Sequence, residues 1–74
     1  MITTETHPYA VELLNSNLGV MSTIRSTTEK SALWNAENLT YLLGRENKRG
    51  EMVTVIVAKK WTGDSWEIIT ETEY

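Results

Sequence analysis

The sequence predicts an α+β fold, with two helices packed on a small antiparallel sheet of two to three strands. Three observations predict it. Residues 51–73 carry the pattern of a β-hairpin, residues 29–43 repeat apolar side chains at helical spacing, and a shorter helical pattern begins near residue 6. We expect the C-terminal hairpin to form the centre of the sheet. The 74 residues make one domain, residues 1–74, with residues 1–5 as a disordered tail.

Composition places the chain among ordered globular proteins, because 41% of its residues are hydrophobic and 23% are charged. The absence of cysteine excludes disulfides, thiolate nucleophiles and cysteine metal sites. A formal charge of −3 argues against a dedicated duplex-DNA binder. The N-terminus lacks the features of a signal peptide, and no apolar run has the length of a membrane span. We therefore expect a cytoplasmic protein that does not enter a membrane.

The first predicted helix begins at Thr6, whose hydroxyl suits an N-cap, and Pro8 is compatible with its first turn. Apolar residues then recur at helical spacing, at Tyr9, Ala10, Leu13 and Leu14. Residues 15–19, which end in Gly19, form a plausible helix stop.

Residues 20–25 have two readings. The alternation of Val20, Ser22 and Ile24 suits a strand, whereas Leu14, Leu18 and Met21 continue a helical stripe through Gly19. We predict a strand, because an isolated hairpin is a poor sheet and needs a third strand or a packed helix.

The second predicted helix covers residues 29–43 and stops at Gly44. One stripe of the helix carries Ala32, Ala36, Leu39 and Leu43. A rival reading makes residues 38–44 a strand, since Leu39, Tyr41 and Leu43 also alternate. The sequence leaves the choice between helix and strand open over residues 20–43, and residues 45–50 read as an exposed loop.

The register of the C-terminal hairpin follows from its turn. Gly63 and Asp64 suit a two-residue loop, because glycine supplies the positive φ of a primed turn. That loop predicts four cross-strand pairs: Trp61 with Trp66, Lys60 with Glu67, Lys59 with Ile68, and Val57 with Thr70.

Alternation then assigns the two faces of the hairpin. We expect the core face to carry Val53, Val55, Val57, Trp61, Trp66 and Ile68. The other face carries Thr54, Lys60, Glu67, Glu71 and Glu73, and it is interrupted by Ile56, Ala58 and Ile69. These three apolar residues predict that another element or a partner partly covers the second face.

No pattern of residues predicts catalysis. His7 is the one histidine, and no spacing supplies metal ligands or a nucleophile beside it. The four glycines are scattered and form no phosphate-binding loop. We therefore expect no enzyme, no catalytic residues, no metal and no cofactor.

The favoured function is binding to a larger protein as a small adaptor, inhibitor or regulatory subunit. On the helical reading Trp34 lies off the main stripe and Tyr41 follows it, so both are candidate anchors, although Trp34 fits a core position equally well. Ile56, Ala58 and Ile69 would form a second apolar contact patch. A homodimer is also compatible with such a patch.

The alternative function is binding of single-stranded nucleic acid. Its cations would be Arg45, Lys48, Arg49, Lys59 and Lys60, with Trp61 and Trp66 as a stacking surface. Against it, so small a core needs both tryptophan rings. A third hypothesis is that Glu67, Glu71 and Glu73 imitate nucleic acid and so inhibit a nucleic-acid-binding enzyme.

Overall fold

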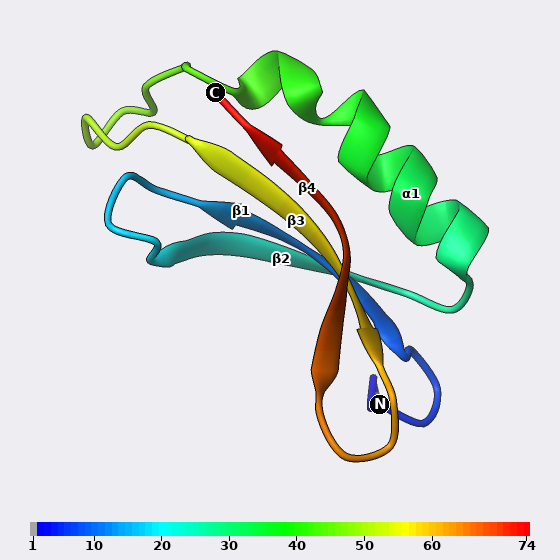
Figure 1. Cartoon of the computed structure of the whole chain (residues 1–74). Coiled ribbons are helices and arrows are strands. Elements are labelled where there is room, and N and C mark those ends of the chain that lie inside the picture. The colour runs from blue at the N-terminus through cyan, green and yellow to red at the C-terminus, as the bar shows by residue number, and fades with distance from the viewer. Residues whose placement is uncertain (1) are drawn as a thin grey trace.

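The computed structural model describes residues 2–74, and these form two β-hairpins joined by one α-helix (Figure 1). The elements are β1 Tyr9–Leu14, β2 Val20–Ser26, α1 Glu29–Asn38, a 3₁₀ turn Thr40–Leu42, β3 Val55–Trp61 and β4 Trp66–Glu73. The strands make one antiparallel sheet in the order β2-β1-β3-β4. Helix α1 therefore crosses over β1 to connect β2 with β3.

The predicted architecture is wrong in its numbers of helices and strands: the described chain has one α-helix on a four-stranded sheet. The error lies in the first predicted helix, because Tyr9–Leu14 form β1 in place of a helix. This stretch fits the period of a strand and also that of a helix. Tyr9, Val11 and Leu13 alternate as in a strand, whereas Ala10, Leu13 and Leu14 recur at helical spacing. As β1 it pairs with β2 and β3 on its two sides, so tertiary hydrogen bonding decides the outcome.

The centre of the sheet is the β1–β3 pair, and β4 lies at an edge. The prediction that the C-terminal hairpin forms the centre is therefore wrong for β4. Pro8 precedes β1, and its carbonyl accepts a hydrogen bond from the Trp61 amide at 2.7 Å. The predicted strand near residue 20 is confirmed as β2.

The hairpin register is confirmed near the turn and wrong beyond it. The Thr62 amide donates to the Ser65 carbonyl at 2.9 Å around Gly63, whose φ is 106°. Trp61, Lys60 and Lys59 pair with Trp66, Glu67 and Ile68, as predicted. After Ile68 the register shifts by one residue, so Val57 pairs with Glu71 and not with Thr70. The additional residue is Ile69, which packs against the core.

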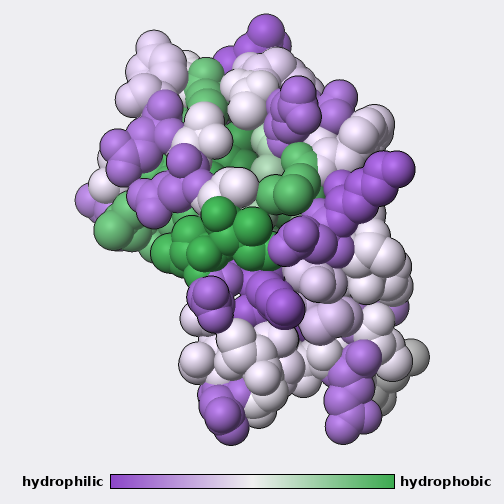
Figure 2. Space-filling view, turned by 45° about the vertical axis from the view of Figure 1, so that its right-hand side comes forward, coloured by the Kyte–Doolittle hydropathy of each residue, from purple (hydrophilic) through white to green (hydrophobic). Residues whose placement is uncertain are grey.

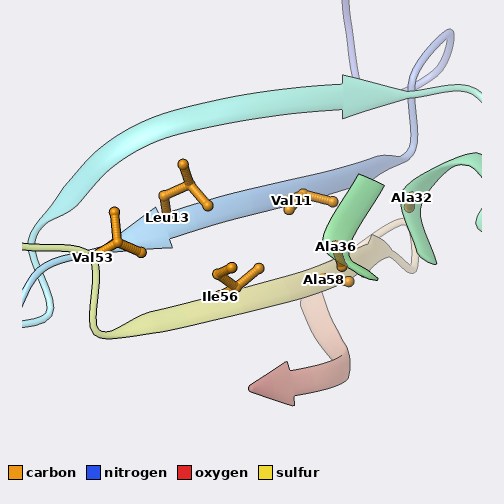
Figure 3. Close-up of a cluster of buried hydrophobic side chains, with 7 residues drawn as sticks. All are labelled: Val11, Leu13, Ala32, Ala36, Val53, Ile56 and Ala58. Carbon is orange, nitrogen blue, oxygen red and sulfur yellow. The ribbon is translucent and has the colours of Figure 1, made fainter. Parts of the chain in front are cut away.

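The expected core face is wrong in part, because α1 covers the opposite face of β3 and β4. Of the expected core residues, Val53 joins the cluster beneath α1, Val55 and Val57 are buried on the uncovered face, and Ile68 is exposed. The buried cluster beneath α1 contains Val11, Leu13, Ala32, Ala36, Val53, Ile56 and Ala58 (Figure 3). Alternation identifies which residues share a face, but β3 is apolar on both faces, so it does not say which face the helix takes. The face with Val55, Val57 and Ile68 carries no helix.

Helix α1 forms because its start is capped and its buried side is small. Thr28 accepts a hydrogen bond from the Ser31 amide at 3.1 Å, and Glu29 favours the first turn. Ala32 and Ala36 face the sheet and let the helix approach it closely (Figure 3). The helix prediction is confirmed for residues 29–38, and the rival strand over residues 38–44 is wrong.

Tyr74 packs against Gly44. The Tyr74 amide donates to the Thr54 carbonyl at 2.8 Å, and the Tyr74 ring lies where a Cβ on Gly44 would be. Gly44 and Gly50 share a φ of 79°, but the described residues leave the space around Gly50 open.

We predict that Gly44→Ala destabilises the fold more than Gly50→Ala does. Both substitutions place alanine in the left-handed region, which lowers the free energy of unfolding by about 1–2 kcal/mol. Only Gly44→Ala also displaces the Tyr74 ring, which lowers it by about 1–3 kcal/mol more. Urea unfolding followed by circular dichroism measures the difference. Equal losses would show that Tyr74 does not pack on Gly44.

Candidate interaction surfaces

The outer surface of α1 exposes a tryptophan. Trp34 is 63% exposed, and its carbonyl accepts a hydrogen bond from the Asn38 side chain at 2.8 Å. With Thr28, Lys30 and Ser31 it lines a shallow depression of about 280 Å³. We call these four residues the α1 surface. Trp34 is therefore a surface residue, which excludes the core position that the sequence left open.

Tyr41, in the 3₁₀ turn that follows α1, is 60% exposed. The guanidinium carbon of Arg45 lies 5.7 Å from the centre of the Tyr41 ring. This distance fits an exposed cation–π contact, so the two side chains form a small second surface feature.

The helix-free face of the sheet, which we call the open face, is the larger apolar surface. Its apolar residues are Leu14, Val20, Val55, Val57 and Ile68, with Leu18 at the tip of the β1–β2 hairpin. Leu18, Val20 and Ile68 are 67%, 56% and 55% exposed. Figure 2, in which the α1 side of Figure 1 is turned forward, shows an apolar area with hydrophilic side chains around it.

The tryptophans of the hairpin lie at one end of the open face. Trp61 and Trp66 meet edge to face, with ring centres 5.4 Å apart. Arg25 reaches from β2 toward β4 and places its guanidinium carbon 5.0 Å from the Trp66 ring centre. Ala10, the partner of Arg25 on β1, is small enough to leave room for this contact.

The guanidinium of Arg25 is held by a hydrogen bond at one end. Nη2 donates to the His7 carbonyl at 2.9 Å. Nε is buried, and no hydrogen-bond partner for it exists among the described residues. Partial desolvation strengthens a cation–π contact, so we expect the Arg25–Trp66 contact to contribute about 1–2 kcal/mol.

Lys59 and Glu12 form an ion pair between β3 and β1 in the middle of the open face. Both side chains are mostly buried, at 26% and 17% exposure. Their stems shield the neighbouring Val57 from water. The remaining acidic residues of the open face, Glu71 and Glu73, lie on β4 beyond the bulge.

Leu18 adopts a backbone conformation that leucine rarely takes. Its φ is 62°, in the left-handed region, at a cost of about 1–2 kcal/mol. The turn is fixed by Asn15, whose Oδ1 accepts hydrogen bonds from the Asn17 and Gly19 amides at 3.0 and 2.8 Å. Because the Leu18 side chain is exposed, its packing within the described chain does not offset the energy of this strain. We interpreted residues 15–19 as a helix stop, whereas they form the turn between β1 and β2. No pattern in the sequence indicated the conformation of Leu18.

The predicted second contact patch lies beneath α1. Ile56 and Ala58 belong to the buried core cluster, and Ile69 packs against it. The patch is thus covered by the protein's own helix. Its sequence signal, apolar residues on an otherwise polar strand face, is accounted for by the core.

The predicted nucleic-acid-binding cations are divided between two places. Arg45, Lys48 and Arg49 line a depression of about 770 Å³ that also includes Leu13 and the start of β2. Lys59 and Lys60 pair with Ala10 and Tyr9 at the other end of β1. Five residues of strand, about 17 Å, separate the two ends.

The acidic residues of the mimic hypothesis are also divided. Glu67 pairs with Lys60, whose other neighbour is Tyr9 on the helix-covered side. Because of the bulge at Ile69, Glu71 and Glu73 instead pair with Val57 and Val55 on the open face. The three carboxylates do not form one row.

Residues 2–74 contain no group of three or more His, Asp or Glu side chains placed to hold a metal ion. Nδ1 of His7 lies 2.9 Å from the Thr6 hydroxyl at the surface. Within these residues no helix has the length and apolarity needed to cross a membrane.

No protein-family model, curated protein or solved structure matches the chain. Arguments about function therefore rest on the surfaces described above.

We predict that Arg25→Ala lowers the free energy of unfolding by about 1–2 kcal/mol, because it removes the contact with Trp66 and the donor to the His7 carbonyl. Arg25→Lys should recover little of this loss, since lysine lacks the planar fork. Urea titration read by tryptophan fluorescence measures both variants, with exposed Arg49→Ala as the control. Full rescue by lysine would contradict the stacked geometry.

Proposed function

We propose that the protein is a non-enzymatic interaction module that docks on a larger protein through the α1 surface, with Trp34 as the anchor. The observation that carries this proposal is the 63% exposure of Trp34 on the outer side of a well-anchored helix. Tryptophan is enriched among the residues that dominate protein interfaces. Truncation of such a residue weakens binding by about 2 kcal/mol or more, which is at least about a tenfold loss of affinity.

The support for Trp34 comes first from the rigidity of its position. Thr28 caps the helix, and Ala32 and Ala36 fix its inner side against the sheet. A side chain on an anchored helix loses little backbone entropy on binding. The partner therefore meets a preorganised anchor.

The surroundings of Trp34 support a protein partner in particular. Thr28, Lys30 and Ser31 give the depression a polar rim with one positive charge. An apolar centre with a polar rim is the usual anatomy of a protein interface. The exposed Tyr41 and Arg45 add residue types that interfaces also favour.

Single-stranded nucleic acid is less well supported as the ligand. The cations proposed for it do not share one surface, and Lys59 is already paired with Glu12. Glu71 and Glu73 place negative charge on the open face, the same face that carries the tryptophan pair. Repulsion between these carboxylates and phosphates opposes binding there.

The decisive variant is Trp34→Ala. We expect it to reduce capture of a protein partner from a lysate of the source cell by at least about tenfold, while the fold remains stable because alanine favours a helix. Quantitative mass spectrometry of the captured proteins measures the effect.

The matched control is Glu37→Ala, which alters another exposed position on the same helix. It should leave capture unchanged. Undiminished capture by folded Trp34→Ala, or capture that disappears after nuclease treatment, would overturn the proposal.

A further inference from the structure

We propose that the open face binds a second copy of this chain face to face, so that the protein is a homodimer with its two α1 helices on the outside. This inference concerns the side of the sheet opposite α1 and does not depend on the function of Trp34.

The apolar content comes first. A sheet with apolar residues on both faces requires a layer against each, and the chain supplies only α1. Val20 on β2 and Ile68 on β4 remain more than half exposed on the uncovered face. With Leu14, Val55 and Val57 between them, they form an apolar band across all four strands.

Leu18 extends this band at the tip of the β1–β2 hairpin. It lines the same depression of about 350 Å³ as Val20, Val57 and Ile68. Glycine or asparagine would take its left-handed conformation without strain. A leucine there is explained if its side chain contacts another molecule, because strained residues are retained where they contribute to a contact.

The size of the face fits one more copy. The two largest extents of the molecule are 35 and 20 Å, so a flat contact on one side covers at most roughly 700 Å² of each copy, within the ~600–1,000 Å² per partner of specific complexes. Sheets that pack face to face lie about 10 Å apart and interdigitate their side chains. A second identical face supplies the complementary apolar band without a further element.

Charges of opposite sign lie toward opposite ends of the open face. The guanidinium of Arg25 lies toward the Trp61–Trp66 end, while Lys59 and Glu12 neutralise each other between the two ends. Glu71 and Glu73 lie toward the opposite end of β4. A two-fold axis across the strands brings the basic end of each copy over the acidic end of the other. Such self-complementarity is what an isologous interface requires.

Sedimentation equilibrium of the purified full-length chain over a wide range of concentrations tests the inference. We expect a monomer–dimer equilibrium. Leu18→Gly should raise the dimer dissociation constant by about tenfold while leaving the isolated chain at least as stable, because glycine relieves the strained φ. Ile68→Lys should weaken the dimer further, and Glu71→Lys should weaken it by placing like charges together.

Trp34→Ala is the control on the opposite side and should leave the dimer unchanged, which separates this inference from the proposed function. A chain that stays monomeric at every concentration would overturn the dimer. So would a dimer that is indifferent to Leu18→Gly and Ile68→Lys, since its contact would lie elsewhere. A monomer whose open face instead binds a different protein, so that capture depends on Ile68 and not on Trp34, would equally contradict it.

Discussion

Burial of β3 on both of its faces is the constraint on which the rest of the structure depends. Four consecutive residues, Val55 to Ala58, are buried, with Ile56 and Ala58 beneath α1 and the two valines on the open face. Such a strand is stable only in the interior of a sheet. It therefore requires β1 on one side and β4 on the other, and β1 in turn pairs with β2. The single helix covers one face, so the second face remains exposed with its apolar residues.

The same constraint determines which side of α1 faces outward. Ala32 and Ala36 lie against the sheet, and the helical period then directs Trp34 away from it. The α1 surface and the open face consequently lie on opposite sides of one sheet layer. A contact on either side leaves the other accessible, so a dimer through the open face would present two copies of Trp34 to a larger partner. In a chain of 74 residues this arrangement leaves two exposed surfaces on opposite sides of one sheet.

Local chemistry in the sequence was sufficient for the turn of the C-terminal hairpin and for α1. Gly63 determines the hairpin loop, and from it the pairing of Trp61 with Trp66 follows. Local chemistry was insufficient for β1, where a helical period and a strand period coexist. There the choice between helix and strand depends on pairing with β2 and β3. The bulge at Ile69 was equally invisible, because neighbouring isoleucines fit either register. For the surfaces, Trp34 was identifiable as an off-stripe aromatic residue, whereas the open face required knowledge of where α1 packs.

The most direct test of this account is a dilution series of ¹⁵N-resolved NMR spectra, which follows the backbone amides and the three indole N–H groups separately. The account predicts that dilution shifts the signals of open-face residues such as Leu18, Val57 and Ile68 together with the indoles of Trp61 and Trp66, while the indole of Trp34 stays constant. Shifts confined to Trp34 and Tyr41, or spectra that do not change with concentration, would contradict the assignment of the open face to a second copy.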